Sequence, residues 1–365
     1  MPNLVTTIRC ALSLLAPAAF YTVWITSQQK GLRDYWFQAL RTGELAQSPD
    51  AKLLESFTGL RAIDVGLKAL VVSFWPVCNG ENPSLSLLAL PFAATAGASY
   101  ILLALEARRT KSAVAVAWRL AWFGVLQAFY SQALLLPIYC AFTLSPGQNV
   151  VRNLKSHRRA TFCSIPGLKT CLLVGYYMCI PMLALPSPSL VTHRAKQVLL
   201  VSMVVWTLWV FPMLWVASRI NGAGESGPRP EKDRRSIYIF ALGTTAIAHG
   251  TALVHPLLCR TRSDGCGDDL SPTNVFLPPL PWSIGRFSSL EEGVASFLQW
   301  DYLITNVTLL LWATAVYLRD CGEEIRGFRV ALQTLVLSTL ASPAGAAVAL
   351  IWRLDWNLSR QAKME

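Results

Sequence analysis

Asp301 is a carboxylic acid at the start of a long apolar run. It lies in FLQWDYLITN (297–306), which continues as VTLLLWATAVYL before the chain becomes charged at Arg319. An acid at membrane depth costs free energy unless a partner or a reaction uses it. A carboxyl group in hydrocarbon surroundings favours its protonated form, so Asp301 is a candidate proton donor. The alternatives are that it lies at the membrane interface, caps a helix or pairs with an arginine.

Six polar residues fall on two neighbouring stripes of this expected helix. They are Asp301, Thr305 and Thr308 on one stripe, and Gln299, Tyr302 and Asn306 on the other. The spacing of three to four residues puts each set on one helical face. Two polar stripes predict a helix that faces protein or a cavity rather than lipid. We therefore expect Gln299, Tyr302 and Asn306 to bind substrate, with Gln299 and Tyr302 orienting the acid or a substrate oxygen.

Two further acids are candidates to tune Asp301 or to take the final proton. Asp64 begins a second apolar run in GLRAIDVGLKALVVSFWP, and Lys68 follows four residues later. An ion pair within the helix is the competing explanation for Asp64. Glu81 lies in the turn WPVCNGENPSLSL between two apolar runs. The alternative for Glu81 is an ordinary turn acid in solvent.

Aromatic rings would stabilise a carbocation through cation–π attraction. Trp300 and Trp312 share the apolar run of Asp301, and we expect them to shield such a cation, although interface anchoring explains many of the 13 tryptophans. His249, in TAIAHGTALVHP, is a candidate substrate ligand or a buried ring that satisfies a neighbour. An acid, aromatic surroundings and no metal together favour proton-initiated cyclisation of a polyprene.

Motifs for other kinds of chemistry are missing from the sequence. There is no DDxxD, DxDD, GxGxxG, GxxxxGK[ST], GxSxG, HExxH or CxxC pattern, and the four histidines form no histidine box. These patterns mark diphosphate–magnesium, nucleotide, serine-hydrolase and zinc sites. We therefore predict no metal and no cofactor.

The composition predicts an integral membrane protein. Of 365 residues, 53% are hydrophobic and only 15% charged, and the mean hydropathy is +0.41, whereas globular domains contain about 25% charged residues. The net charge of +11 is interpreted as loop Lys and Arg facing lipid headgroups, not nucleic acid. The bilayer is thus the expected partner, and the endoplasmic reticulum the expected location.

The apolar runs predict an all-α, polytopic helix bundle of about nine spans (seven to nine). The runs cover roughly residues 6–26, 62–78, 85–105, 116–144, 167–187, 197–218, 236–257, 302–318 and 328–352. We expect one transmembrane domain over 1–365, with a surface segment at 27–61 and a lid-like loop at 258–296. Pro137 should kink the fourth span. SSLEEG (288–293) should start a short interfacial helix that leads into the eighth.

Four stretches resemble a known family, the fungal membrane-bound terpene cyclases of the ascofuranone and macrophorin type. They are FTGLRAIDVGLKALVVSFWPVCNG (57–80), FGVLQAFYSQALLLPIYCAF (123–142), VFLPPLPWS (275–283) and SLEEGVASFLQWDYLITN (289–306). The resemblance implies cyclisation of a farnesyl-type chain, started by protonating an alkene or a terminal epoxide. It also implies a lipophilic prenylated aromatic substrate in fungal meroterpenoid, secondary-metabolite biosynthesis. The alternative is a multi-span transporter or efflux protein without catalytic activity.

Overall fold

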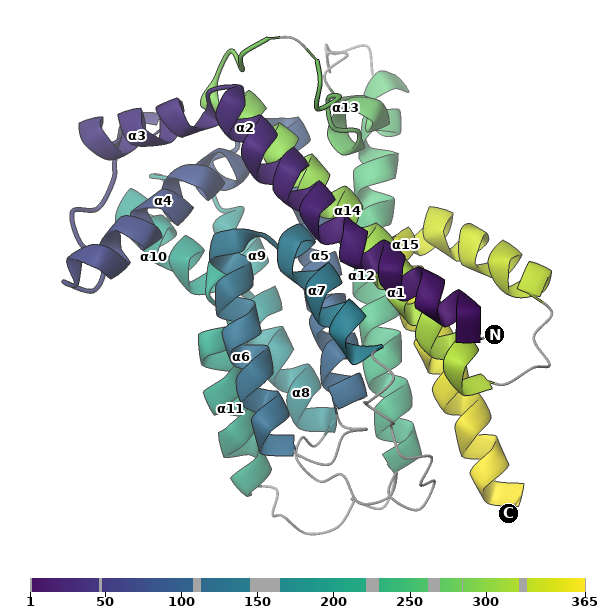
Figure 1. The fold of residues 1–365 in the computed structure, drawn as a ribbon. Coiled ribbons are helices and arrows are strands. Elements are labelled where there is room, and N and C mark those ends of the chain that lie inside the picture. The colour runs from purple at the N-terminus through teal and green to yellow at the C-terminus, as the bar shows by residue number, and fades with distance from the viewer. Residues whose placement is uncertain are drawn as a thin grey trace.

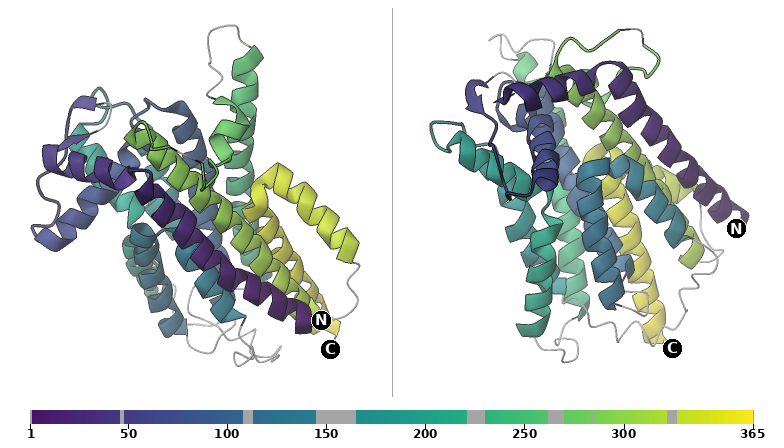
Figure 2. Two further views of the ribbon diagram at one scale, coloured as in Figure 1. Left: turned by 45° about the horizontal axis from the view of Figure 1, so that its top comes forward. Right: turned by 60° about the vertical axis from the view of Figure 1, so that its left-hand side comes forward.

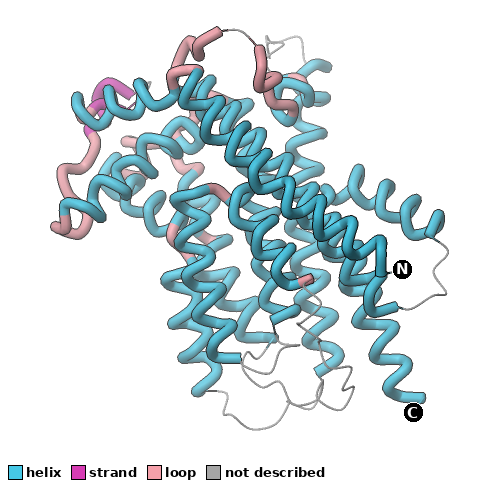
Figure 3. The backbone as a smooth tube through the Cα atoms, in the orientation of Figure 1, coloured by secondary structure: helices cyan, strands magenta, loops and turns pink. Residues whose placement is uncertain are grey.

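The computed structural model describes residues 2–45, 48–107, 113–144, 165–220, 230–261, 270–283, 285–321 and 327–364. These residues form helices joined by loops, together with one small antiparallel hairpin beside α3, drawn in magenta (Figure 3). The first elements are α1 (Pro2–Ala19), η1 (Phe20–Ile25), α2 (Thr26–Gln29), α3 (Leu32–Thr42), β1 (Glu44–Leu45), β2 (Ser48–Lys52), α4 (Arg61–Cys78) and α5 (Pro83–Ala107). The all-α prediction is confirmed.

The rest of the chain is helical as well. The elements are α6 (Ala113–Tyr130), α7 (Gln132–Thr143), α8 (Ile165–Leu172), η3 (Leu173–Tyr177), α9 (Cys179–Leu183), α10 (His193–Val204), α11 (Thr207–Ile220), α12 (Pro230–Thr261), α13 (Pro272–Phe276), α14 (Leu290–Cys321) and α15 (Gly327–Met364). η1 and η3 are π-helical turns, which are rare and often occur at functional sites.

The predicted count of nine spans is not confirmed. Among the described residues, five helices are long and apolar enough to cross a membrane. They are Leu4–Gln29, Pro83–Glu106, Asp233–Leu258, Leu290–Asp320 and Val330–Arg360. A sixth span results if α10 and the first part of α11, bent by 68°, are counted together. The other predicted runs are helical too, but they fold into shorter or broken helices.

Breaks in the helices explain the difference. The expected span 116–144 is two helices that meet at Ser131, and Pro137 lies inside the second of them. The last helix, α15, contains a non-helical residue at Ser342, directly before Pro343. Figures 1 and 2 show its first part leaving the second at a steep angle. The Pro343 ring removes a backbone donor and crowds the residue before it, so the break in α15 falls at Ser342.

α14 lies in the middle of the bundle. It packs against α1, α5, α7 and α15, and the long purple α1 runs beside it (Figure 1). A large core of buried apolar residues, including Leu309, Trp312 and Val316 of α14, joins these helices. Polar residues of α14 are therefore placed among helices rather than against lipid.

A smaller layer covers the N-terminal end of α14. α3, α4 and α10 share a second buried cluster with Val294, Leu298 and Tyr302 of α14. α3 and the hairpin occupy much of the predicted surface segment 27–61, and the exposed charges of α3 agree with a surface helix. The single-domain assignment and the lid function of 258–296 remain predictions, and residues 262–269 and 284 of that loop lie outside the described residues.

Candidate functional site

The start of α14 follows the predicted capping signal. The Oγ of Ser289 accepts a hydrogen bond from the Glu292 N–H at 3.3 Å, and Glu292 Oε2 accepts from the N–H and hydroxyl of Ser288, both at 2.7 Å. Ser289 is therefore the N-cap, and Glu292 reaches back to Ser288, one residue further than in a capping box. The helix then continues without a break to Cys321. The expected short interfacial helix and the eighth span are thus one helix, α14. Because this helix is continuous, its packing in the bundle sets the direction in which Asp301 points.

Asp301 is buried, with 3% of its surface exposed, and it contacts the N-terminus of α7. Its Oδ1 accepts the backbone N–H of Ala133 at 2.5 Å and the Thr305 hydroxyl at 3.4 Å. Ala133 is the second residue of a helix, where an N–H has no partner inside the helix. The alternative of a helix cap is therefore realised. The backbone N–H of Gln132 also faces this carboxyl group, so the first two N–H groups of α7 both lie at Asp301.

Asn306 makes the corresponding contact with α15. Its Oδ1 accepts the Ala344 N–H at 3.0 Å, while its amide donates to the carbonyl of Tyr302 at 2.9 Å. Ala344 is the second residue after the break at Ser342. Asn306 is 2% exposed, and these two bonds use its amide group for holding a helix. Asn306 lies within about one helical turn of Tyr302, as predicted for a residue of the site. Its two hydrogen bonds, however, are made to the protein backbone and hold α15 against α14.

Tyr302 directly follows Asp301 in α14, so its side chain leaves the helix about 100° around the axis from the α7 contact. Its hydroxyl faces the side chains of Thr95 and Asn306. The Tyr302 hydroxyl and Thr95 Oγ1 are both buried, and neither makes a hydrogen bond of normal geometry with a described residue. Buried hydroxyls without partners are uncommon and costly. Two such groups on facing helices therefore form a site where a ligand oxygen would be held.

His249 and Phe276 complete this polar and aromatic group. The Phe276 ring of α13 lies 5.8 Å from the Tyr302 ring and 5.8 Å from the His249 ring, measured between centroids. His249 Nδ1 is also buried without a hydrogen-bond partner among the described residues. The structure thus brings the predicted His249 and Tyr302 together through Phe276. Sequence reasoning missed Thr95 and Phe276, although Phe276 lies in one of the resembling stretches.

Gln299 and Trp300 hold the segment that contains α13. Gln299 Nε2 donates to the carbonyls of Asn274 at 2.6 Å and Val275 at 3.2 Å. Trp300 Nε1 donates to the carbonyl of Pro279 at 3.3 Å. The expectation that Gln299 orients Asp301 does not match this geometry, because its amide nitrogen is bound to backbone carbonyls of the loop. Gln299 acts on the site indirectly, by fixing the position of α13.

The side of α14 that carries Asp301 has its own aromatic cluster. Trp24 of η1 contacts Trp36 and Phe297 edge to face, with centroids 6.4 Å and 5.6 Å away. Trp24 Nε1 donates to the Tyr130 carbonyl at 3.1 Å, directly before the break at Ser131. Trp24, Phe297 and Trp300 pack against the buried group around Ala133, the residue bound to Asp301. The sequence did not single out Trp24, Trp36 or Phe297.

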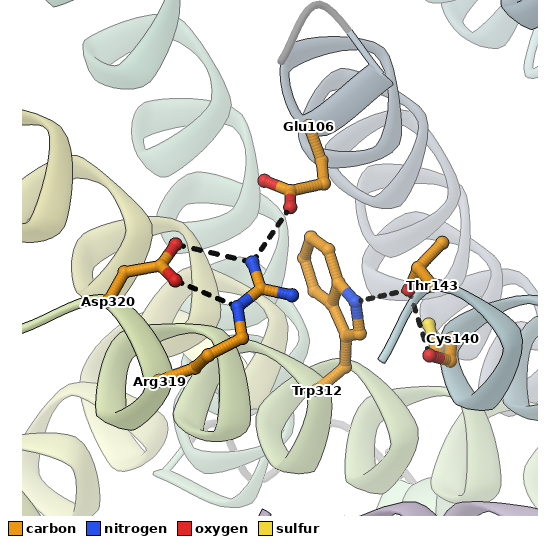
Figure 4. A network of polar contacts seen from close by, with 6 residues as sticks. All are labelled: Glu106, Cys140, Thr143, Trp312, Arg319 and Asp320. Atoms are coloured by element: carbon orange, nitrogen blue, oxygen red, sulfur yellow. Dashed lines mark hydrogen bonds and ion pairs between the residues drawn. The ribbon is translucent and has the colours of Figure 1, made fainter. Parts of the chain in front are cut away.

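Trp312 belongs to a separate polar network (Figure 4). It is fully buried, and its Nε1 donates to Thr143 Oγ1 at 3.0 Å. Nearby, Arg319 contacts Glu106 at 3.3 Å and Asp320 at 2.7 Å. Trp312 lies eleven residues after Asp301, which is about 16 Å along a helix at about 1.5 Å per residue. At that distance its indole cannot shield a cation formed beside Asp301, so the expected role of Trp312 does not fit the structure.

Asp64 organises a turn before α4. Its carboxylate accepts hydrogen bonds from the Ser56 hydroxyl at 2.7 Å, the Thr58 hydroxyl at 2.8 Å, and the N–H groups of Phe57, Thr58 and Gly59 at 2.7 to 3.2 Å. These bonds, led by that from Ser56, hold the pKa of Asp64 well below its usual value against the opposing effect of burial. The competing explanation, a pairing with Lys68, is replaced by this turn, and a carboxylate so fully bound is a poor proton carrier.

Glu81 is exposed in the turn after α4, and its backbone N–H donates to Asn79 Oδ1 at 3.0 Å. Asp64 and Glu81 stand at opposite ends of α4, whose 18 residues span about 27 Å. The structure therefore does not bring these two acids together. No cluster of three or more potential metal-ligating side chains occurs in the part of the chain that the structure describes.

Comparisons with known proteins identify the family. The CtvD domain matches residues 8–358. The chain is 48% identical to terpene cyclase sdgD of Emericella nidulans, over 97% of this chain and 96% of that protein. It is 35% identical to terpene cyclase verU1 of Penicillium polonicum, over 97% and 95%.

A more distant relative is terpene cyclase ascI of Acremonium egyptiacum, 26% identical over 84% of this chain and 82% of that protein. No solved structure matches. The resemblance seen in the sequence is confirmed for the family of fungal membrane-bound terpene cyclases, while the ascofuranone subtype is not. With a family match over nearly the whole length, the chain belongs to the CtvD-domain family.

Proposed function

We propose that this protein is a multi-pass membrane terpene cyclase that starts ring closure by proton transfer from Asp301. Cyclase activity rests on relatives that carry this name over nearly the full length of the chain. The same relatives set aside the alternative of a transporter without chemistry. The identity of the acid rests on one structural observation: Asp301 is buried inside the bundle, with its carboxyl group held at the N-terminus of α7.

The proposed reaction needs no outside electrons. The O–H bond of protonated Asp301 breaks as a C–H bond forms at a terminal alkene, or as an epoxide oxygen accepts the proton and its C–O bond opens. The resulting carbocation is attacked by the next alkene, whose π electrons form the ring bond. Loss of a proton from carbon to the Asp301 carboxylate closes the cycle. Substrate and product therefore have the same mass, and the acid is regenerated.

The surroundings of Asp301 suit a carbocation. Trp24, Phe297 and Trp300 supply aromatic faces on the Asp301 side of α14, and such faces attract cations. Burial excludes water, which would otherwise quench the cation. Oδ1 is held by the end of α7, so the carboxyl group does not rotate freely. A fixed acid lowers the entropy cost of reaching the reactive geometry.

The neighbouring face of α14, which carries Tyr302, supplies polar contacts for the substrate. The hydroxyls of Tyr302 and Thr95 and the imidazole of His249 have unused hydrogen-bonding atoms. We assign them to an oxygen of a prenylated aromatic, with the farnesyl-type chain reaching across to Asp301. Asp64 and Glu81 receive no step in this scheme, because Asp64 is bound within a turn and Glu81 is exposed. Gln299 acts as a positioning residue through α13.

We also place the protein in the endoplasmic reticulum of a fungus and in meroterpenoid secondary metabolism. Five or six candidate spans support a multi-pass arrangement, and the relatives named above are fungal. A lipophilic prenylated substrate would partition into the bilayer where the enzyme resides.

The test uses microsomes from an expressing host, fed with a farnesylated phenol and, separately, its terminal epoxide. EDTA is present, and no nucleotide is added. The expected result is a product of unchanged mass and altered retention, absent with microsomes of the Asp301→Asn variant. Unchanged substrate in both forms, with enzyme present in the membrane, would contradict the proposed substrate class. Activity lost to EDTA would contradict a metal-free mechanism.

A further inference from the structure

The segment that contains α13 and the loop after it has no charged residues. Residues 270–283, LSPTNVFLPPLPWS, contain no Asp, Glu, Lys or Arg. Three large apolar side chains of this segment point outward, with exposed fractions of 60% for Leu277, 55% for Leu280 and 73% for Trp282. We call residues 277–282 the Pro-rich loop. Figure 1 shows it in green, arching from α13 toward α2 and the start of α14. An apolar surface of this kind marks a contact with protein or membrane.

Several polar backbone groups of the Pro-rich loop are either missing or bound within the protein. Pro278, Pro279 and Pro281 have no N–H group that would need a partner. The Pro279 carbonyl accepts from Trp300 Nε1 at 3.3 Å. The Leu280 carbonyl accepts from Lys30 Nζ at 3.3 Å and from the hydroxyl of Ser283 at 2.8 Å. Irregular backbone in hydrocarbon is stable only when such groups are bound within the protein.

The donors to this segment lie inside or directly beside two candidate membrane-spanning helices. Gln299 and Trp300 lie nine and ten residues into the candidate span Leu290–Asp320, about 14 to 15 Å along the helix at about 1.5 Å per residue. Lys30, 9% exposed, directly follows the candidate span Leu4–Gln29. The segment is therefore tied at one side to the interior of a span and at the other to the end of a span. This is the depth range where hydrocarbon meets headgroups, and tryptophan is enriched there.

We propose that the Pro-rich loop is immersed in the bilayer, where Leu277, Leu280 and Trp282 contact lipid acyl chains. The absence of charged residues within 270–283, the bound carbonyls of Pro279 and Leu280 and the hydrogen bond to Trp300 of α14 favour lipid over a soluble partner. The sequence predicted a lid that closes the site against water. In this proposal the outer side of the loop contacts lipid instead. Phe276, directly before the loop, contacts His249 and Tyr302 on its inner side. The loop then separates the candidate substrate site from the hydrocarbon.

The test places a photoreactive benzophenone amino acid at Trp282 or Leu280 of the full-length protein, reconstituted in phosphatidylcholine vesicles. Both side chains are exposed, so the substitutions should leave the fold intact, which is checked by thermal unfolding. After illumination, lipid adducts are counted by mass spectrometry. Leu14, 70% exposed on α1, is the matched position facing lipid, and Asp50, an exposed charged residue of β2, is the polar control.

Adduct yields at Trp282 and Leu280 should equal the Leu14 yield within about twofold and exceed the Asp50 yield at least about fivefold. Yields at the Asp50 level would overturn the proposal. Cross-links to a second copy of the chain in place of lipid would overturn it too, since they would show a protein interface. The readout needs no turnover, so it stands apart from the outcome of the cyclase assay.

Discussion

Asp301 and Asn306 hold two broken helices in the same way. The Oδ1 atoms of these residues accept the N–H of Ala133 in α7 and of Ala344 in α15, at 2.5 Å and 3.0 Å. Each N–H belongs to the second residue after a serine with positive φ, Ser131 at 74° and Ser342 at 71°. α14 thereby fixes the N-terminal ends of both half-helices within the bundle, where water cannot bind them.

The serines complete these two caps. Ser131 Oγ accepts the Leu134 N–H at 3.3 Å, and Ser342 Oγ accepts the Gly345 N–H at 3.2 Å. The second and third N–H groups of each half-helix are therefore bound. At φ and ψ of 74° and 150°, and of 71° and 161°, both serines occupy a backbone region that glycine adopts more easily. The strain persists because the side chain and α14 both hold the break in place.

Substitutions of Ser342 should separate strain from capping. Ser342→Ala loses the cap, worth about 1 kcal/mol, and keeps the backbone strain of about 1–3 kcal/mol. Ser342→Gly loses the same cap but relieves the strain. The melting temperature in detergent should therefore fall clearly for Ser342→Ala and change little for Ser342→Gly. An equal fall for both variants would show that the positive φ carries no strain that matters.

Removing the unpartnered hydroxyls should affect stability and activity in opposite directions. Tyr302→Phe and Thr95→Val delete buried hydroxyls that face each other without a hydrogen bond of normal geometry, and such groups cost about 1–3 kcal/mol when left unsatisfied. The variants should melt at the same or a higher temperature, while KM for the prenylated substrate rises several-fold. A lower melting temperature with unchanged KM would mean that these hydroxyls serve the fold.

The Arg319 network should contribute stability through its geometry. Arg319, with 25% of its side chain exposed, contacts both Glu106 and Asp320. Arg319→Gln should lower the free energy of unfolding by about 2 kcal/mol, since hydrogen bonds to charged groups are worth about 1.5–3 kcal/mol. Arg319→Lys should recover only part, because an ammonium group cannot replace the planar fork. Chemical unfolding in detergent measures both. Full recovery by lysine would show that charge alone matters.

Asp64 should make stability depend on acid pH. Its pKa is lowered in the folded protein, first by the Ser56 hydroxyl, so its stabilising effect is present above the unfolded pKa of about 3.9 and is lost as pH falls below it. Melting temperature measured from pH 6 down to pH 3 should decline less steeply for Asp64→Asn than for the parent protein. Ser56→Ala should give an intermediate slope. Identical slopes for all three would contradict the assignment.

The sequence predicts the helices better than their breaks. All nine apolar runs are helical, because their length and hydropathy are local properties. The break at Ser131 has no local signal, since Tyr130, Ser131 and Gln132 are all acceptable in a helix. It is stabilised by Asp301, 170 residues away in the chain. Tertiary contacts of this kind decide whether a long apolar run becomes one span or two shorter helices.

The site was predicted in part for the same reason. Polar residues on α14 are visible from their spacing, but the partners that each side chain finds are not. Thr95 and Phe276 resemble ordinary apolar-run residues until α5 and α13 bring them to Tyr302. The Asp64 turn likewise depends on hydroxyls at 56 and 58, which the sequence presents only as loop residues.

Asp301 is the residue on which the proposed mechanism depends, and two substitutions distinguish its roles. Asparagine keeps an oxygen that can accept the Ala133 N–H, as it does at helix caps generally, but has no acidic proton. Alanine removes both the acceptor and the acid. Asp301→Asn should therefore fold with a melting temperature close to that of the parent protein, whereas Asp301→Ala should be less stable.

The most direct measurement is the turnover of farnesylated phenol or its epoxide by Asp301→Asn in microsomes, at matched amounts of folded protein. General acid catalysis contributes about 10²- to 10⁴-fold, so the rate should fall at least about a hundredfold while the melting temperature stays close to the parent value. A folded Asp301→Asn protein that keeps the parent rate would show that Asp301 only anchors α7, and it would contradict the proposed mechanism.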